Sequence, residues 1–299
     1  MIRTFATAKN ITEWNGAKIE HHGKNMNNKR CVIIVPAYKN DLPEVEVLAL
    51  KQVVKILGNK YEIVLVCPST LDVKKYNEVA KYDFSVLRCP NCYFKSQKTY
   101  SDLCENWEFY DALIEYEYMV IYQLDAWIFE DKLEYFMNMG YDYIGGVHLV
   151  THTKEGENGN GGFCLRKVKI FRDVCKKTNF SKIPNGQLED CAFTQALKNN
   201  FNLAPVNICR QFSFQEMPAT QFKKNGNKLP MGCHAWRKFN KGFWLPYIMP
   251  GEIKEQLQAM PSKTLTGIYG DDVAANFREK IKRTNNSKLN KKVLIRKFR

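Results

Sequence analysis

Two polar side chains interrupt an apolar segment in the middle of the sequence. Residues 118–122 are large and apolar, Gln123 and Asp125 follow, and residues 126–129 are apolar again. Such a β-branched and aromatic run is typical of a buried strand. A carboxylate at the carboxyl end of a buried strand lies where open α/β sheets bind ligands, and it needs a donor, a cation or a metal beside it. The alternative is an aspartate that only caps a turn.

Three later segments carry residue types that also suit a site. Residues 156–166 are rich in glycine, which lets a backbone approach a ligand closely. Glu189 and Asp190 are adjacent at an expected helix start, where the helix dipole favours carboxylates. His234 lies in the run Gly-Cys-His-Ala-Trp. Taken singly, each has an ordinary explanation: a turn, a pair of helix-terminal acids, and a core histidine.

Apolar runs alternate with amphipathic stretches through the part of the chain that must position these residues. Strands are expected at residues 31–37, 61–67, 84–88, 118–122 and 141–147. Helices are expected at residues 42–57, 72–81, 99–117, 167–178 and 186–197, and a glycine-rich loop at residues 156–166. Strands that are apolar on both faces and alternate with helices predict an α/β fold with a mostly parallel sheet flanked by helices.

Composition and motifs exclude several classes of protein. The chain has 299 residues, 44% of them hydrophobic, which suits one large α/β domain with additions or two small domains. It contains no run of eighteen apolar residues and no apolar secretory leader, so we expect a cytoplasmic protein. No GxGxxG follows the first expected strand and no Walker loop occurs, which argues against dinucleotide and P-loop chemistry.

The ten cysteines do not form a metal-binding pattern. Cys89 and Cys92 make the single CxxC motif, and no second pair lies at zinc-finger spacing. Several of the others lie inside apolar runs, as reduced core thiols do. Ordinary thiols are therefore expected.

The net charge of +14 is concentrated towards the end of the chain. Nine basic residues cluster there: Lys280, Lys282, Arg283, Lys288, Lys291, Lys292, Arg296, Lys297 and Arg299. With the apolar residues among them, such a segment could bind an anionic membrane surface, or it could be a solvated tail. No helix-turn-helix, RNP-like or zinc-finger pattern occurs, so no nucleic-acid partner is expected.

The order of the four segments is similar to that of a known enzyme group. Gln-Leu-Asp-Ala-Trp at residues 123–127, Gly-Asn-Gly-Gly-Phe at 159–163, the Glu-Asp pair and Gly-Cys-His-Ala-Trp at 232–236 follow one another in sequence. This resembles the GT-A glycosyltransferases, in particular an uncharacterised bacterial glycosyltransferase-like family, and the middle blocks resemble motifs of the β-1,4-galactosyltransferases. The resemblance covers about residues 31–247.

The resemblance implies a metal site. Asp125 matches the metal-binding second acid of a DxD motif, and His234 matches a late metal ligand. A carboxylate and an imidazole suit Mn²⁺ or Mg²⁺ whose coordination is completed by phosphate and water. Gln123 replaces the first acid, which weakens the expected affinity, so a metal-independent enzyme that uses basic residues is the alternative.

The resemblance also implies the other roles at the site. Asp190 matches a general base for the acceptor hydroxyl, and Glu189 could orient the acceptor or exchange roles with it. The expected contacts of the nucleotide sugar are Pro36, Ala37, Tyr38, Gln123, Asp125, Gly161 and Gly162. Lys98, Tyr100 and Arg166 are further plausible contacts of the diphosphate or the sugar.

Three parts of the chain are expected from this resemblance. Residues 1–30 form an N-terminal extension, residues 31–249 a GT-A-like, Rossmann-type domain, and residues 250–299 a basic helical extension. Within the domain, residues 31–130 form the nucleotide-sugar half and residues 131–249 the acceptor half.

The function that this resemblance implies is sugar transfer. The donor would be a nucleotide-diphosphate sugar, and the acceptor a glycan or lipid-linked glycan of a bacterial surface polysaccharide such as capsule or lipopolysaccharide. The reaction would be inverting, and the enzyme cytoplasmic or peripheral at the inner face of the membrane. The rivals are a nucleotidyltransferase-like α/β enzyme, and a non-catalytic glycan- or nucleic-acid-binding protein with a degenerate site.

Overall fold

The computed structural model describes most of the chain. It describes residues 17–22, 29–148, 157–182, 188–197 and 201–249. The chain divides into two compact units: residues 1–216 with 230–235, and residues 217–229 with 236–299. The basic segment at residues 278–299 lies outside the described residues, and so does the rest of the expected C-terminal extension.

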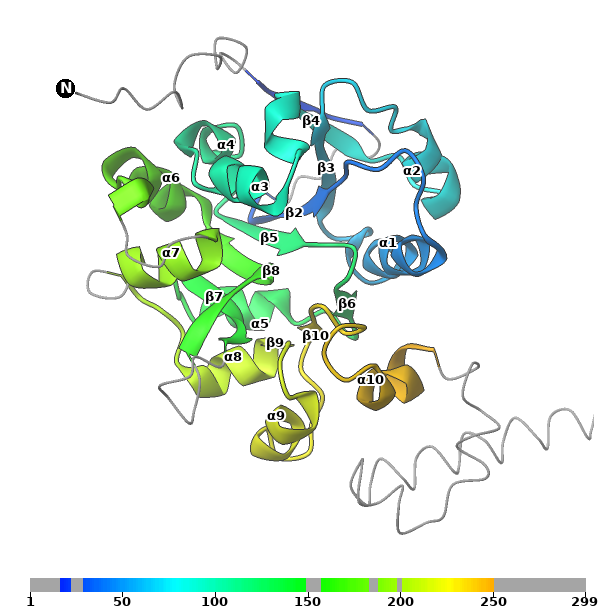
Figure 1. Cartoon of the computed structure of the whole chain (residues 1–299), viewed down its shortest axis with the longest axis vertical. Helices are drawn as coiled ribbons and strands as arrows, with labels where there is room; N and C mark the ends of the chain where they lie inside the picture. Colours follow the sequence, from blue (N-terminus) through cyan, green and yellow to red (C-terminus); the bar gives the residue numbers. More distant parts are fainter. Residues whose placement is uncertain (1–16, 23–28, 149–156, 183–187, 198–200, 250–299) are drawn as a thin grey trace, which may run out of the picture. The chain divides into compact units, whose positions relative to one another are not determined.

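A seven-stranded sheet forms the centre of the first unit, in the order β1-β4-β3-β2-β5-β8-β7 (Figure 1). Its strands are β1 (Ile19–Glu20), β2 (Cys31–Pro36), β3 (Glu62–Pro68), β4 (Ser85–Cys89), β5 (Tyr118–Tyr122), β7 (Tyr143–His148) and β8 (Glu157–Lys167). Strands β4, β3, β2 and β5 pair in parallel, whereas β8 is antiparallel to both β5 and β7. Strand β7 therefore points the same way as the parallel strands, and the expected mostly parallel α/β sheet is confirmed.

Helices cover both faces of this sheet, because its central strands are apolar on both sides. The helices of the first unit are α1 (Glu44–Leu57), α2 (Lys74–Ala80), α3 (Gln97–Cys104), α4 (Trp107–Asp111), α5 (Leu133–Asn138), α6 (Val168–Lys177), α7 (Glu189–Leu197) and α8 (Val206–Phe212). One core contains buried side chains of α1, α2, α5 and α8, and a second contains those of α3, α4, α6 and α7. Figure 1 shows α1 and α2 on one side of the strands and α3 and α4 on the other.

The glycine-rich segment is a strand, so the expectation of a loop was wrong. Strand β8 pairs with β5 from Tyr118 to Tyr122 and also with β7, where the register shifts near Gly146. The glycines do not break the strand because β7 pairs with this part of β8, and the Gly162 carbonyl oxygen accepts a hydrogen bond from the backbone N–H of Gln123 on the other side. They instead leave space that neighbouring side chains occupy, as described below.

The single helix expected at residues 99–117 is two short helices. Ser96 begins α3 with a capping box that includes Thr99. Asn106 caps α4 by accepting a hydrogen bond from the backbone N–H of Glu108. Such caps satisfy backbone donors at a new helix start, which explains why the amphipathic stretch is interrupted.

A small three-stranded sheet brings distant residues together beside the main one. Its strands are β6 (Trp127–Ile128), β10 (Gly232–Cys233) and β9 (Ser213–Phe214), in the order β6-β10-β9. The backbone N–H of His234 also donates to the carbonyl oxygen of Phe214. Segments separated by about a hundred residues therefore meet directly after Asp125.

The second unit contains two described helices, α9 (Pro218–Lys224) and α10 (Lys241–Ile248). Its packing is aromatic: the rings of Phe222 and Phe243 lie 5.7 Å apart, and those of Phe243 and Trp244 4.9 Å apart.

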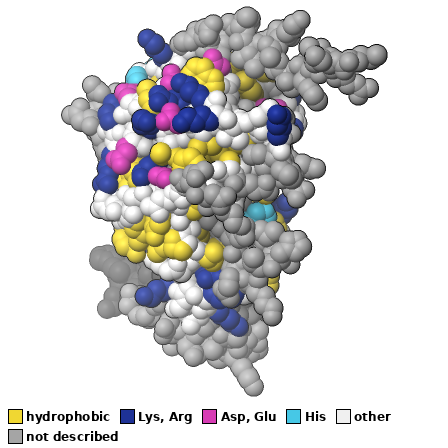
Figure 2. Space-filling model, turned by 90° about the vertical axis from the view of Figure 1, so that its left-hand side faces the viewer, with side chains coloured by type: hydrophobic (Ala, Val, Ile, Leu, Met, Phe, Trp, Pro, Cys, Tyr) yellow, Lys and Arg dark blue, Asp and Glu magenta, His cyan; other side chains and the backbone are white. Residues whose placement is uncertain are grey.

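The surface of the described residues carries charges of both signs. On the face drawn in Figure 2, basic and acidic side chains lie next to one another. Ion pairs such as Arg172 with Asp111, at 3.2 Å, join charges on different helices. None of the described helices is long and apolar enough to cross a bilayer.

Candidate active site

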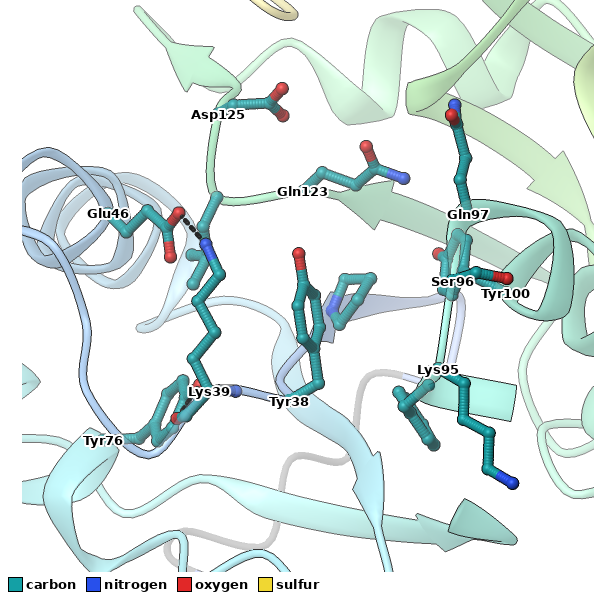
Figure 3. A pocket seen from close by; sticks show the side chains of 13 residues that line it. Tyr38, Lys39, Glu46, Tyr76, Lys95, Ser96, Gln97, Tyr100, Gln123 and Asp125 are labelled. Atoms are coloured by element: carbon teal, nitrogen blue, oxygen red, sulfur yellow. Dashed lines mark hydrogen bonds and ion pairs between the residues drawn. The ribbon is translucent and has the colours of Figure 1, made fainter. Parts of the chain in front are cut away.

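A cavity of about 470 Å³ lies at the carboxyl ends of β2 and β5. Figure 3 draws the side chains around it, with the Tyr38 ring among them. Its lining residues come from the segments after β2 and β5, from the start of α3, and from α1 and α2: Pro36, Tyr38, Lys39, Glu46, Tyr76, Phe94, Lys95, Ser96, Gln97, Tyr100, Gln123, Leu124 and Asp125. The carboxyl ends of adjacent parallel strands are where open α/β sheets bind ligands.

Strands β2 and β5 place polar residues at the cavity in the same way: each strand is buried and ends just before those residues. Strand β2 is buried along its whole length and ends at Pro36, so that Tyr38 emerges with 53% of its surface exposed. Strand β5 is also fully buried and ends at Tyr122. The backbone N–H of Gln123 then donates to the carbonyl oxygen of Gly162 at 2.9 Å, which anchors the turn that carries Asp125.

Asp125 and Gln123 meet His234 at the edge of this cavity. The imidazole Nε2 lies 3.1 Å from Asp125 Oδ1 and 3.1 Å from Gln123 Oε1. Its Nδ1 lies 2.7 Å from Gln215 Oε1. The side chain of His234 is 11% exposed and that of Asp125 52% exposed, so one member is held inside and the other faces solvent.

This donor set fits a small divalent cation. An imidazole nitrogen, a carboxylate oxygen and an amide oxygen are ligand types that Mn²⁺ or Mg²⁺ can take, and the two oxygens both lie 3.1 Å from His234 Nε2. Among the described residues, however, no group of three His, Cys, Asp or Glu side chains is placed to hold a metal. Phosphate or water ligands would therefore be needed.

Charges around Asp125 keep it ionised. Burial raises the pKa of this carboxyl, but the hydrogen bond and charge of His234, its own backbone N–H and the charge of Lys39 outweigh burial and hold the pKa below its usual value. Burial lowers the pKa of Lys39, but its hydrogen bond to Glu46 and the charges of Glu46 and Asp125 raise it overall. The cavity thus holds an anion and a cation side by side at neutral pH.

Two consecutive glycines of β8 make room for the acidic and imidazole groups. A Cβ on Gly162 would lie 2.0 Å from His234 Nε2. A Cβ on Gly161 would lie 2.5 Å from Glu189 Oε1 and 3.3 Å from the Cβ of Asp190. Glycine is required here because the side chains of its neighbours occupy the space.

The acidic pair at the start of α7 is divided between interior and surface. Glu189 is 6% exposed and Asp190 is partly buried. Glu189 Oε1 lies 3.5 Å from Arg166 Nη2. Burial raises the pKa of Glu189, Arg166 lowers it and Asp190 raises it, for a net rise. Arg166 itself is fully buried, so the expectation that it contacts the diphosphate or the sugar was wrong.

The structure brings several of the expected site residues together. Pro36, Tyr38, Gln123 and Asp125 line one cavity, as does Tyr100. Ala37 is buried, and its backbone N–H donates to the carbonyl oxygen of Val66.

Sequence reasoning missed two groups of the site. Lys39 and Glu46 line the cavity. Lys39 directly follows Tyr38, which was a signal that could have suggested it, and Glu46 joins the site from the first turn of α1 by pairing with Lys39. Gln215 contacts His234 only because β9 pairs with β10, and no local pattern announces this contact.

The comparison with family models shows the family to which the chain belongs. A model described as "Protein of unknown function (DUF5672)" matches residues 83–234, which is half of the chain. The chain belongs to the DUF5672 family. The matched range of this DUF5672 chain contains all five polar residues of the candidate site: Gln123, Asp125, Glu189, Asp190 and His234. No curated protein sequence matches the chain.

The chain is similar to several solved structures at low sequence identity. The glycosyltransferase GlyE of Streptococcus pneumoniae TIGR4 is 14% identical at a TM-score of 0.47, and the match covers 75% of this DUF5672 chain and 61% of GlyE. Mouse xyloside xylosyltransferase 1 is 10% identical at a TM-score of 0.48, with 69% and 97% covered. Core-mannan synthase A of Aspergillus fumigatus in a Mn/GDP form is 11% identical at a TM-score of 0.40, with 62% and 73% covered.

Proposed function

We propose that this protein is a glycosyltransferase that moves a sugar from a nucleotide-diphosphate sugar to a hydroxyl group of a glycan or lipid-linked glycan. The observation that carries the proposal is the meeting of Asp125, Gln123 and His234 at the edge of the cavity. The order of the sequence blocks supports it, since it resembles the order of the motifs of GT-A enzymes, with Gln123 in place of the first acid. Sugars of bacterial surface polysaccharides are the proposed acceptors.

The cavity suits the nucleotide part of the donor. Its lining combines aromatic rings with a few polar groups, as small-molecule sites do. Tyr38, which is exposed, offers a ring on which a base or ribose can rest. Lys39 and Lys95 supply positive charge for phosphate oxygens. When bound at Asp125 and His234, Mn²⁺ or Mg²⁺ would supply the charge that stabilises the departing diphosphate.

Asp190 is the proposed general base. The acceptor oxygen would form a bond to the anomeric carbon as the bond from that carbon to the diphosphate oxygen breaks, and Asp190 would take the hydroxyl proton. Attack from the face opposite the leaving group inverts the anomeric centre. Asp190 lies beside Gly161, and the next residue, Gly162, contacts His234. This closeness to the proposed metal ligand supports the role of Asp190.

The experiment measures binding and turnover separately. Thermal unfolding is followed with UDP-, GDP- and dTDP-sugars, with and without Mn²⁺, and CMP-sugars serve as a control without a diphosphate. A ligand that binds only the native state raises the midpoint, so one diphosphate sugar should stabilise the wild type. Asp125→Ala should lose most of this stabilisation, and Asp190→Ala should keep it but lose sugar release.

Other outcomes separate the rival functions. Release of pyrophosphate from a nucleoside triphosphate and a sugar phosphate would identify a nucleotidyltransferase. A wild type that binds glycans equally well after both substitutions would be a non-catalytic binding protein. If no sugar nucleotide stabilises the wild type or is hydrolysed by it with Mn²⁺ present, the proposed function is wrong.

A further inference from the structure

A buried arginine lies inside the core that contains α3, α4, α6 and α7. Arg166 on β8 has no exposed surface. The rings of Phe171 and Phe193 lie 5.1 and 5.2 Å from its guanidinium carbon, and Nη1 donates to the hydroxyl of Tyr110 at 2.8 Å. A charge removed this far from water is costly unless an opposite charge and hydrogen bonds compensate for it.

Glu189 supplies the opposite charge and uses both of its oxygens to do so. Its Oε1 lies 3.5 Å from Arg166 Nη2, and its Oε2 accepts a hydrogen bond from the Ser101 hydroxyl at 3.1 Å. The side chain is 8% exposed. A carboxylate engaged in this way inside the protein is not placed to accept a proton from a bound acceptor.

These contacts join three elements of the site. Ser101 belongs to α3, whose Gln97 and Tyr100 line the cavity. Arg166 belongs to β8, and Glu189 is the first residue of α7. Gly161 adds a steric limit, because Glu189 Oε1 occupies the place where its Cβ would be. The first turn of α7 is thus held by a charge, a hydroxyl and a close backbone contact.

We propose that Arg166 and Glu189 are a positioning pair that fixes the first turn of α7, and with it the carboxylate of Asp190, against β8 and α3. The inference rests on the proposed function only for the task of Asp190. Stability alone does not account for such a pair, because hydrophobic residues of similar size are often as stabilising or more so. We therefore assign to Arg166 and Glu189 the role of holding Asp190 in place.

Cys191 provides a test that needs no substrate. This thiol follows Asp190 and is partly buried, whereas Cys92 is exposed. Burial, the charge and hydrogen bond of Asp190 and, least, the charge of Glu189 raise the pKa of Cys191 to about 11, so its alkylation is sensitive to displacement of this turn. Iodoacetamide labelling of both cysteines in the full chain would be followed by peptide mass spectrometry at one pH.

The variants are Glu189→Gln, and Arg166→Met combined with Glu189→Leu. The double variant removes both buried charges, and we expect it to stay folded because apolar residues often replace a buried ion pair without loss of stability. Arg172→Met, which removes an arginine from a surface ion pair, is the matched control. We expect both test variants to label Cys191 about fivefold faster or more at unchanged Cys92 labelling, because the local opening free energy falls. If the folded double variant labels Cys191 within about twofold of the wild type, the pair does not hold this turn and the inference is wrong.

Activity provides a second, separable readout. With any donor that the wild type hydrolyses, Glu189→Gln should keep the donor dissociation constant and lower kcat about 10- to 100-fold, because a displaced base is poorly aligned. The acidic limb of the pH profile, on which kcat rises as the base loses its proton, should remain. If that limb disappears, Glu189 is itself the base and the inference is wrong. If the wild type hydrolyses no donor, the proposed function fails, and the labelling of Cys191 decides the positioning role alone.

Discussion

Two glycines of this site matter because they have no side chain, which leaves room for neighbouring groups. Gly162 admits the His234 ring, and Gly161 admits the Glu189 carboxylate. The glycines therefore act through the contacts of their neighbours. This differs from the expectation that Gly161 and Gly162 contact the donor, which stays a prediction. His234 in turn depends on Gln215, which sets the direction of its ring.

Gly162→Ala tests this steric role. The new methyl group would displace the imidazole from Asp125 and Gln123, and we expect Mn²⁺ affinity to fall about tenfold or more. Overpacking should also lower the free energy of unfolding by about 1–3 kcal/mol. Isothermal titration with Mn²⁺ and urea unfolding measure the two effects. Gly242→Ala, whose Cβ would meet only an ordinary contact with Asn240, is the control. Unchanged Mn²⁺ affinity in Gly162→Ala would contradict the metal site.

At the scale of elements, the end of α3 holds an acid in an unfavourable place. Glu105 is the C-terminal cap of this helix, where the helix dipole disfavours a negative charge. Its Oε1 is buried and has no hydrogen-bond partner among the described residues. Burial raises the pKa of Glu105, Lys98 lowers it, and Asp102 and Glu189 raise it, to about 7.

Glu105→Gln should stabilise the protein in a pH-dependent way. Between the unfolded value of 4.5 and the folded value of about 7, the folded state binds more protons than the unfolded state, so this residue costs stability as the pH rises. We expect the variant to gain about 1–3 kcal/mol at pH 8 and almost nothing at pH 4. Urea unfolding at both pH values measures this gain. Glu78→Gln, on an exposed helix surface, should show no such trend. An equal effect at both pH values would exclude titration of Glu105 as the cause.

At the scale of the whole molecule, the site depends on distant parts of the chain. The cavity residues come from positions 36 to 125, and Gln215 and His234 complete the site from the far end of the first unit. The expected boundaries at residues 30, 130 and 249 stay predictions. Within the expected N-terminal extension, β1 pairs with β4 at the edge of the sheet.

Removal of residues 250–299 tests the expected membrane role of the basic end. Each basic side chain near an anionic bilayer contributes about 1 kcal/mol, and salt screens this attraction. The full chain should sediment with vesicles that contain phosphatidylserine at low salt, and a chain ending at Met249 should not. Neutral phosphatidylcholine vesicles are the control, and donor-induced thermal stabilisation shows that the shorter chain is folded. Equal sedimentation of both chains would contradict the membrane role.

Local patterns in the sequence determined the strands that frame the cavity and the residues at their ends. The runs at residues 31–36 and 118–122 are strands because β-branched and aromatic side chains suit a buried sheet, and Asp125 must then lie at a carboxyl edge. The acids at residues 189 and 190 likewise begin a helix. These features depend on neighbours in sequence, which a single chain displays.

Tertiary structure alone decided which of these residues meet. Residues 159–162, three of which are glycines, form a strand because β7 pairs with one edge and the backbone N–H of Gln123 binds the Gly162 carbonyl at the other. Arg166 is buried because helices α3, α4, α6 and α7 form the core on its face of the sheet, and Glu189 lies beside it there as the opposite charge. His234 reaches Asp125 through the pairing of β10 with β6 and β9. Contacts between segments a hundred residues apart leave no local pattern, because their energy comes from packing that exists only in the folded chain.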